Sequence, residues 1–322
     1  VKKITSNLSI NFILMKINNL FVILGLLSCF SFAQAKGIQK TTSIFAVKDS
    51  SELKMDIYTV DSTFSSPQPC LMFVFGGGFK EGKRDEPGYQ SYFDFFAKKG
   101  FVVVSIDYRL GMKGQKAPGV FNTKPLQNAI SLAVSDLYSA TKFLIEKADS
   151  LKIDKKRIII SGSSAGAITV LQAEYELKNH FPLATELPGD FRYAGVISFA
   201  GGIFSTEGIP TYAESPAPTL FFHGSADKLV PYKETRLFNK GMFGSKSLTK
   251  NFHKNNYPYL FYSMEGLGHE VASFPMNEFL PEIEQFIENF VFERKSWMVE
   301  VYFTDKQRKT NASITPSSYY NK

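Results

Sequence analysis

The sequence predicts an α/β protein built on a mostly parallel sheet that helices cover on both faces. Two apolar runs, Leu71–Phe75 and Phe101–Asp107, have no polar face, which is typical of strands buried on both sides. Amphipathic stretches of helical period, such as residues 126–149, alternate with runs of this kind. Strands that alternate with helices along a chain indicate βαβ units and hence a parallel sheet.

The expected elements follow one another in an order that fits this class. Ser43–Val47 and Leu53–Val60 are expected to form an opening hairpin. The remaining strands are expected at residues 71–75, 101–107, 157–161, 194–199, 219–222 and 260–264. The helices are expected at about 88–99, 126–149, 165–179, 232–241 and 276–293.

Composition indicates one ordinary globular domain. Hydrophobic residues make up 44% of the 322 residues and charged residues 21%, so a chain of this size can bury a core without metal or disulfide. No linker or internal repeat interrupts the chain before about residue 294. We expect a single catalytic domain over residues 36–294, followed by a C-terminal tail, 295–322, with one more apolar patch.

The formal net charge of +7 does not indicate a nucleic-acid partner. Residues 1–35 hold three lysines and no acid, and residues 295–322 hold five basic residues against two acidic ones. A nucleic-acid binder is expected to gather its charge on one folded face, with aromatic residues between the cations. Here the excess lies at the two ends of the chain, so no nucleic-acid partner is expected.

Residues 1–35 have the layout of a leader with a signal peptide, with translation starting at Met15. Lys16 precedes the apolar stretch Phe21–Leu27, and Ala33-Gln34-Ala35 forms a small-x-small cleavage site. The apolar stretch is too short to span a bilayer as a helix, so no stable membrane span is expected. We therefore expect an exported protein, periplasmic or extracellular.

A second kind of export is also compatible with the leader. Leu26-Leu27-Ser28-Cys29 resembles a bacterial lipoprotein box, in which Cys29 would carry a lipid anchor. Cleavage after Ala35 instead leaves Cys70 as the only mature cysteine, so no internal disulfide forms. Cys70 opens an apolar run and is expected to be a small buried residue.

Residues 162–166 read Gly-Ser-Ser-Ala-Gly between an expected strand and an expected helix. This is the G-x-S-x-G pattern in the strand–turn–helix context of a nucleophile elbow, and it makes Ser164 the candidate nucleophile. The turn places the hydroxyl at a helix N-terminus, where developing negative charge is favoured. A purely structural Gly/Ser turn is the alternative.

Three consecutive glycines, Gly76-Gly77-Gly78, end the strand at 71–75. Each glycine costs roughly 0.5–1 kcal/mol relative to alanine, so close backbone approach must be required there. In acyl transfer that requirement is an oxyanion hole. We assign its donors to the amides of Gly77, Gly78 and Ala165, with a flexible loop as the alternative.

The chain has four histidines, and only His269 stands in a glycine-rich loop between the last expected strand and the last helix. Loops at the carboxyl ends of parallel strands converge, so His269 is the expected general base. His223 is expected to be structural, and His180 and His253 to lie on the surface. Asp227, which closely follows the strand at 219–222, is the expected acid that orients the imidazole, with helix capping as its alternative role.

Taken together, these residues resemble the α/β-hydrolase superfamily, and within it the carboxylesterase and hormone-sensitive-lipase-like esterases, including the feruloyl and acetylxylan esterase-like group. The motifs are Gly76–Phe79, Asp107-Tyr-Arg-Leu110, Gly162–Gly166 and His223–Pro231, within about residues 40–292. The order Ser, Asp, His along the chain is that of the superfamily. The resemblance implies a mostly parallel eight-stranded sheet and a serine carboxylic-ester hydrolase that works through an acyl-enzyme.

One position departs from the family pattern, because Phe75 stands where a histidine usually precedes the glycines. This substitution affects the hydrogen bonding of the oxyanion loop and leaves the reaction class unchanged. Asp107 and Arg109 are interpreted as structural, as a local ion pair or cap that organises the loop. No metal or organic cofactor is implied.

The expected substrate is a small-molecule or glycan-linked ester, such as an acetyl or feruloyl ester of a polysaccharide. The pocket walls are expected in the loops 111–125 and 203–218. Four aromatic residues are the candidate substrate contacts: Phe79, Phe121, Phe204 and Tyr212. Two other functions remain open, a serine peptidase of the prolyl-oligopeptidase type and a non-catalytic binding protein with the hydrolase fold.

Overall fold

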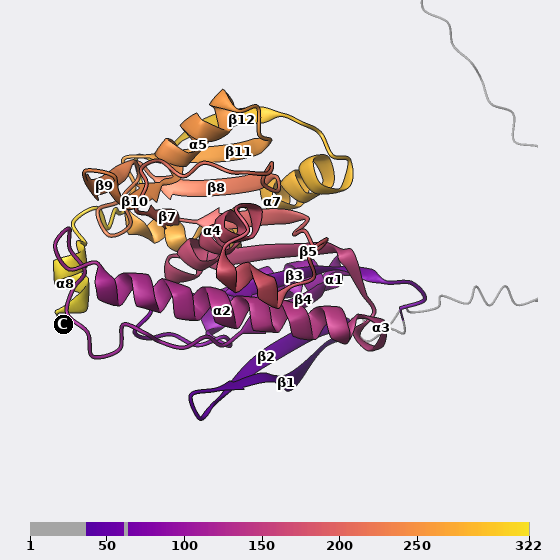
Figure 1. Cartoon of the computed structure of the whole chain (residues 1–322). Coiled ribbons are helices and arrows are strands. Elements are labelled where there is room, and N and C mark those ends of the chain that lie inside the picture. The colour runs from indigo at the N-terminus through magenta and orange to yellow at the C-terminus, as the bar shows by residue number, and fades with distance from the viewer. Residues whose placement is uncertain (1–36, 61–63, 322) are drawn as a thin grey trace, which may run out of the picture. The chain divides into compact units, whose positions relative to one another are not determined.

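The computed structural model describes residues 37–60 and 64–321, and a nine-stranded sheet runs through them (Figure 1). The strands of this sheet are β1 (Ile38–Lys48), β2 (Ser51–Val60), β3 (Gln68–Val74), β4 (Val102–Ile106), β5 (Ile153–Ser163), β6 (Gly195–Phe199), β8 (Thr219–Gly224), β11 (Tyr259–Glu265) and β12 (Met298–Thr304). Their order across the sheet is β1-β2-β4-β3-β5-β6-β8-β11-β12. Strand β2 pairs antiparallel with β1 and β4, and all other neighbours are parallel.

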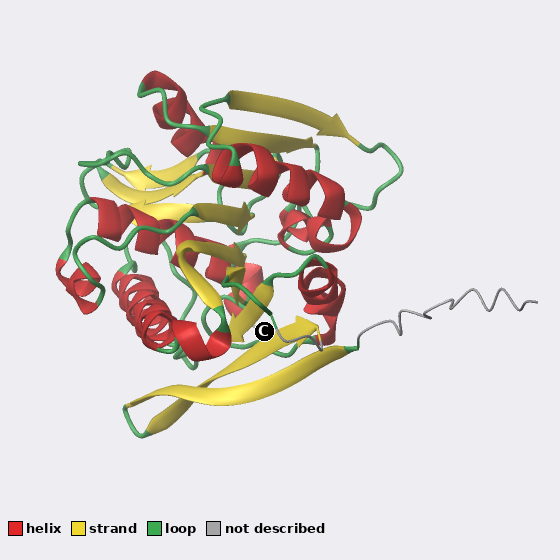
Figure 2. Cartoon of the chain, turned by 90° about the vertical axis from the view of Figure 1, so that its right-hand side faces the viewer, coloured by secondary structure: helices red, strands yellow, loops and turns green. Residues whose placement is uncertain are grey.

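Helices cover both faces of this sheet, as Figure 2 shows. The α-helices are α1 (Gln90–Lys98), α2 (Lys124–Glu146), α3 (Ala148–Leu151), α4 (Ala165–Lys178), α5 (Ser245–Lys254), α6 (Pro275–Glu278), α7 (Leu280–Phe286) and α8 (Pro316–Tyr320). Short 3-10 turns η1 (Pro87–Tyr89), η2 (Pro182–Glu186) and η3 (His269–Ala272) and the π-helical turn η4 (Ile287–Phe292) complete the set. Helix α2 packs against α4, whereas α1 packs against α6.

The predicted class is confirmed. The apolar runs form β3 and β4, whose residues are almost all fully buried because helices lie on both sides. The opening hairpin is present as β1 and β2, and helices occur at three of the expected places as α1, α2 and α4. The sheet has nine strands rather than eight because β12, from the expected tail, adds to its edge.

Two expected helices differ from the structure. Residues 232–241 do not form a helix but the hairpin of β9 (Glu234–Leu237) and β10 (Lys240–Gly244). Strand β10 also pairs with β7 (Gly202–Ser205), so a small three-stranded sheet, β7-β10-β9, replaces the expected helix. The helix expected over 276–293 is divided into α6, α7 and η4, because Pro275 and Pro281 each start a new helical segment.

The described C-terminal residues, through Asn321, are part of the same unit as the rest of the domain, so no domain boundary lies at residue 294. Strand β12 pairs in parallel with β11, and α8 follows at the end of the chain. Met15, Cys29 and the expected signal peptide lie outside the described residues. Within the part of the chain that the structure does describe, no helix is both long and apolar enough to cross a membrane.

Candidate active site

Ser164 lies in a strained turn between β5 and α4. Its φ of 51° is in the left-handed region, which is costly for a residue with a side chain. The flanking glycines make the turn possible: a Cβ on Gly162 would lie 2.3 Å from the carbonyl carbon of Gly166, and a Cβ on Gly166 would lie 2.0 Å from the carbonyl oxygen of Val74. The G-x-S-x-G spacing is therefore a steric requirement of the turn.

The structure brings Ser164, His269 and Asp227 together in one hydrogen-bonded chain. The Ser164 Oγ lies 2.8 Å from the His269 Nε2, and the His269 Nδ1 lies 2.7 Å from the Asp227 Oδ2. His269 opens η3 after β11, and Asp227 follows β8, so each group comes from a different strand end. Hydroxyl, imidazole and carboxylate in this sequence are the groups that activate a serine for nucleophilic attack.

Asp227 is held by backbone amides as well as by histidines. Its Oδ1 accepts hydrogen bonds from the amides of Leu229 at 2.9 Å and Val230 at 3.1 Å. Burial of Asp227 favours the protonated form, but hydrogen bonds from His223 and His269 outweigh it and hold the pKa of the carboxyl well below its usual value. Asp227 is therefore an anion over the whole physiological pH range.

The other histidines lie where the sequence predicted them. His223 is fully buried, with its Nδ1 2.8 Å from the Ser245 Oγ and its Nε2 3.1 Å from the Val230 carbonyl oxygen. It supports the Asp227 loop without reaching Ser164. His180 and His253 are both exposed.

The glycine loop lies against Ser164. A Cβ on Gly76 would be 3.3 Å from the Ser164 Cβ, and Gly77 and Gly78 both have positive φ, 112° and 61°. The Gly77 carbonyl accepts hydrogen bonds from the amides of Lys80 at 3.0 Å and Glu81 at 3.1 Å. Within the described residues, the amides of Gly77 and Gly78 donate no hydrogen bond, so both are free to bind an anion.

An aromatic stack occupies the position at which the family usually has a histidine. The Phe75 ring stacks on Tyr108 with centroids 4.4 Å apart. The Tyr108 hydroxyl donates to the carbonyls of Phe75 at 3.1 Å and Gly76 at 3.4 Å. Tyr108 therefore fixes the start of the glycine loop.

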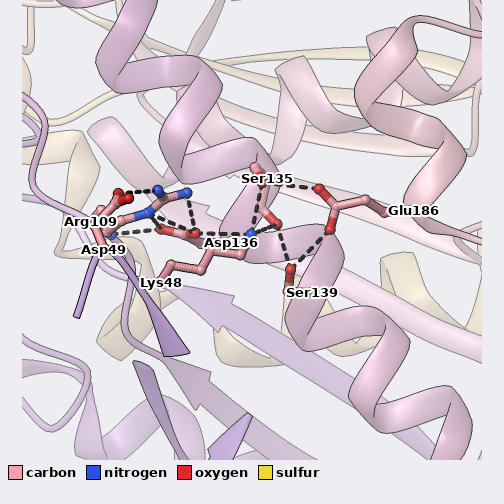
Figure 3. A network of polar contacts seen from close by, with 7 residues as sticks. All are labelled: Lys48, Asp49, Arg109, Ser135, Asp136, Ser139 and Glu186. Carbon is pink, nitrogen blue, oxygen red and sulfur yellow. Dashed lines mark hydrogen bonds and ion pairs between the residues drawn. The ribbon is translucent and has the colours of Figure 1, made fainter. Parts of the chain in front are cut away.

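Asp107 and Arg109 are structural, as predicted, but they do not pair with each other. The Asp107 carboxylate accepts hydrogen bonds from the Arg84 guanidinium at 2.9 and 3.1 Å. The Arg109 guanidinium binds Asp136 of α2 at 2.8 Å and Asp49 of the β1–β2 turn at 2.6 Å (Figure 3). Both residues thus tie the loop after β4 to neighbouring elements.

A pocket opens beside Ser164 and Ala165, and the structure places two of the four expected contacts in its wall. Phe79 and Phe204 line it, together with apolar side chains such as Leu126, Ile168 and Met242. Phe121 is 90% exposed and does not line it, although its neighbours Gly119 and Val120 do. Tyr212 also lies elsewhere, because its ring packs edge-on against three aromatic rings, those of Tyr175, Phe252 and Tyr257.

Other residues of the pocket wall were not predicted from the sequence. Met242 and Gly241 come from β10, which begins within the segment 232–241 that was expected to be a helix. Pro316, Tyr319 and Tyr320 come from α8, close to the end of the chain. The tyrosine pair at 319–320 in an otherwise polar stretch was the only signal in the sequence.

The sheet order and the strand–turn–helix setting of Ser164 define an α/β-hydrolase fold. Solved structures of esterase 2 from Thermogutta terrifontis match this fold. The propionate-bound one has a TM-score of 0.60 and 21% identity, and the match covers 79% of this chain and 95% of that one. Residues 55–201 match the model of the BD-FAE family. That region includes the glycine loop and Ser164 and ends before Asp227 and His269.

Curated relatives match little more than a third of the chain. Esterase B1 of Culex pipiens is 30% identical over 120 residues, which are 37% of this chain and 21% of that protein. Fumonisin B1 esterase of Sphingopyxis macrogoltabida is 29% identical over 116 residues, 36% of this chain and 21% of that protein. The chain therefore matches about a fifth of the length of these relatives.

Proposed function

We propose that the protein is a serine carboxylic-ester hydrolase in which Ser164, His269 and Asp227 form the catalytic triad. The observation that carries the proposal is the continuous hydrogen-bonded chain from Asp227 to Ser164 beside an apolar pocket. The names of the curated relatives, which are esterases, support the same reaction class.

In the proposed reaction, His269 takes the proton of the Ser164 hydroxyl while the Ser164 oxygen attacks the ester carbonyl. The amides of Gly77, Gly78 and Ala165 stabilise the tetrahedral oxyanion. The imidazolium then protonates the departing alcohol, which leaves an acyl-enzyme. A water molecule, deprotonated by His269, attacks this acyl group. The bond to the Ser164 oxygen then breaks, the carboxylic acid leaves, and the imidazolium returns the proton to Ser164. Asp227 keeps the His269 ring in the required tautomer and stabilises the imidazolium.

Replacement of the nucleophile tests this proposal directly. Ser164→Ala is expected to lower kcat for p-nitrophenyl acetate by at least about 10⁴-fold, since the nucleophile itself is lost. Ser150→Ala is a matched control, because the Ser150 hydroxyl bonds the Lys147 carbonyl on the surface. A Ser164→Ala enzyme with wild-type activity would refute the triad.

Covalent labelling separates the proposal from its two rivals. A fluorophosphonate probe is expected to label the wild-type protein and not Ser164→Ala, whereas a non-catalytic binding protein would not react at all. A serine peptidase would also be labelled, but it would cleave peptide p-nitroanilides. The esterase is expected to cleave esters and leave these amides intact.

We further propose acetyl or feruloyl esters of polysaccharides as the substrates. The pocket wall is mostly apolar and includes the rings of Phe79, Phe204 and Tyr319, which suit an acyl or aryl group. A panel of acetyl, butyryl and feruloyl esters, tested free and on xylan, checks this step. The highest kcat/KM on an ester unrelated to polysaccharides would overturn it.

We also propose export, either by cleavage after Ala35 or as a lipoprotein anchored at Cys29. The layout of residues 16–35 supports this proposal. Expression in a bacterial host, followed by fractionation and mass determination of the mature N-terminus, tests it. A protein that starts at Lys36 indicates plain cleavage, an acylated Cys29 indicates a lipoprotein, and an unprocessed cytoplasmic protein contradicts both.

A further inference from the structure

The chain after β12 returns across the candidate active site and packs against the loop of His269. The Asn311 amide donates to the Glu270 Oε2 at 2.8 Å, and the Gly268 amide donates to the Oε1 of the same carboxylate at 2.9 Å. A Cβ on Gly268 would lie 2.5 Å from the Ala312 nitrogen, so the two backbones touch. Residues next to His269 on both sides therefore hold the returning chain.

Helix α8 then packs against the glycine loop. The Tyr320 hydroxyl donates to the Gly78 carbonyl at 2.7 Å, and the Tyr319 hydroxyl donates to the Glu81 Oε1 at 2.8 Å. The Lys80 Nζ donates to the Tyr319 carbonyl at 3.0 Å and lies 4.7 Å from the centre of the Tyr319 ring. Four polar and cation–π contacts thus join two segments that are about 240 residues apart in the sequence.

The contact with the Gly78 carbonyl completes a series that fixes the peptide planes of this loop. In a planar trans peptide the amide N–H points opposite to the preceding carbonyl, so a bonded carbonyl also orients the amide. The Tyr108 hydroxyl bonds the Gly76 carbonyl, and this bond orients the Gly77 amide. In the same way, the amides of Lys80 and Glu81 bond the Gly77 carbonyl, and these bonds orient the Gly78 amide. Tyr320 fixes the next plane, so Gly78 is held on both sides.

Helix α8 also contributes to the wall of the pocket. Pro316, Tyr319 and Tyr320 line it together with Ile168 and Phe204. A Cβ on Gly78 would lie only 2.6 Å from the Tyr319 Cε1, so this ring rests directly on the glycine loop. In Figure 1, α8 (yellow) lies beside the start of α2, whose residue Leu126 lines the same pocket.

We propose that α8 completes the active site, with Tyr320 as a positioning residue for the oxyanion glycines and the Tyr319 ring as a wall that limits the size of the bound ester. The inference rests on the proposed ester hydrolysis. Tyr320 acts through the Gly78 carbonyl and does not touch the reacting atoms. Its loss is therefore expected to affect catalysis less than the loss of an oxyanion donor, which costs about 10²–10³-fold.

Tyr320→Phe removes only the hydroxyl and tests the positioning role. We expect kcat for p-nitrophenyl acetate to fall about 3- to 10-fold, the value of one ordinary hydrogen bond, while KM is unchanged. Rates are normalised to the concentration of protein that a fluorophosphonate labels, so unfolded protein is not counted. Tyr302→Phe is the matched control, because the Tyr302 hydroxyl bonds the Glu300 Oε2 on β12 at 2.9 Å, outside the pocket.

A wild-type kcat in Tyr320→Phe, or an equal fall in Tyr302→Phe, would overturn the positioning role. Failure of the proposed function looks different, since Ser164→Ala would then keep its activity and the probe would not label Ser164. A wild-type enzyme that is labelled and active, with no response to Tyr320→Phe, contradicts only the inference about α8.

Tyr319→Ala tests the wall. The smaller side chain is expected to raise kcat/KM for bulky esters relative to p-nitrophenyl acetate, and Tyr319→Phe, which keeps the ring, is expected to restore the wild-type order of preference. One series varies the acyl group on p-nitrophenol, and a second varies the alcohol of an acetate. A change in either series supports the wall and identifies the part of the ester that it contacts, whereas no change in both series overturns it.

Discussion

Two buried aspartates in this fold have opposite surroundings. The side chains of Asp136 and Asp227 are both fully inaccessible to solvent. Asp136, on α2, binds an arginine and a lysine: the Arg109 Nη2 lies at 2.8 Å and the Lys48 Nζ at 3.3 Å (Figure 3). Asp227 binds two histidines and two backbone amides, and the chain through His269 ends at the Ser164 hydroxyl.

The difference shows that the partners of a buried carboxylate determine whether it only stabilises the fold or also supports proton transfer. A guanidinium stays protonated at every relevant pH, so the Asp136 cluster holds β1, the loop after β4 and α2 together without moving protons. The same cluster extends through Ser135 to Glu186, which binds α2 to η2 (Figure 3). Imidazole gains and loses protons near neutral pH, so only the Asp227 cluster can support proton transfer.

Asp227→Asn is expected to have the largest effect of the substitutions that test this comparison. The amide removes the negative charge that selects the tautomer and stabilises the imidazolium of His269, so kcat should fall about 10⁴-fold. The fold should persist, because the Asn oxygen can still accept from the amides of Leu229 and Val230. Ester hydrolysis and circular dichroism measure the two properties, and a loss of activity explained entirely by unfolding would contradict the assignment.

Asp136→Asn should have the reverse effect. Removal of one member of a buried ion pair leaves the other charge without its partner, so we expect a loss of about 3–5 kcal/mol in the free energy of unfolding. At a temperature where the variant is folded, its kcat per labelled active site should match the wild type. Urea unfolding measures the loss. A selective fall in kcat without loss of stability would place Asp136 in the chemistry and remove the distinction between the two clusters.

The sequence predicted those site residues whose roles depend on a short motif or on their position after a strand. The elbow around Ser164 needs glycines two residues away on each side, and the structure shows the backbone contacts that impose them. The loops of Asp227 and His269 could be assigned because the carboxyl ends of parallel strands meet at one edge. The structural roles of His223 and Arg109 could be predicted from their positions at the ends of strands. Their partners Ser245 and Asp136 lie 22 and 27 residues away in the sequence, and no pattern in the sequence identified them.

Long-range pairing explains most of what the sequence did not predict. Strand β10 is stable because it pairs with β7, which lies about forty residues earlier, so the local amphipathic pattern of 232–241 was misleading. Tyr212 looked available for stacking on a substrate, but Phe252 and Tyr257 from distant segments enclose its ring. Helix α8 has five residues, too few for a periodic pattern, and its role depends on contacts with residues 78–81.

Glu174 is a third buried carboxyl. Among the described residues it pairs neither with an arginine or lysine, as Asp136 does, nor with a histidine, as Asp227 does. It lies on α4 with 2% of its surface exposed; its Oε1 accepts from the Ala217 amide at 2.8 Å, and its Oε2 has no partner among the described residues. Burial raises the pKa of Glu174 to about 7, although Lys178 and the Ala217 amide act in the opposite direction. The folded protein therefore holds a proton at Glu174 that the unfolded chain releases at lower pH.

A raised folded-state pKa stabilises the protein below the unfolded value, and this contribution is lost as the pH rises through about 7. Glu174→Gln keeps the acceptor for Ala217 and cannot ionise, so its stability should vary less between pH 4 and 9. At pH 9 we expect it to exceed the wild type by up to about 3 kcal/mol, and at about pH 4, below the unfolded pKa of the carboxyl, the two should be nearly equal. Thermal unfolding across this pH range measures the effect, with the exposed Glu288→Gln as control. If the stability of Glu174→Gln and that of the wild type changed with pH in the same way, the ionisation of Glu174 would cost no free energy of folding. An unpaired carboxyl at this site would then need neither a cation nor a histidine as partner.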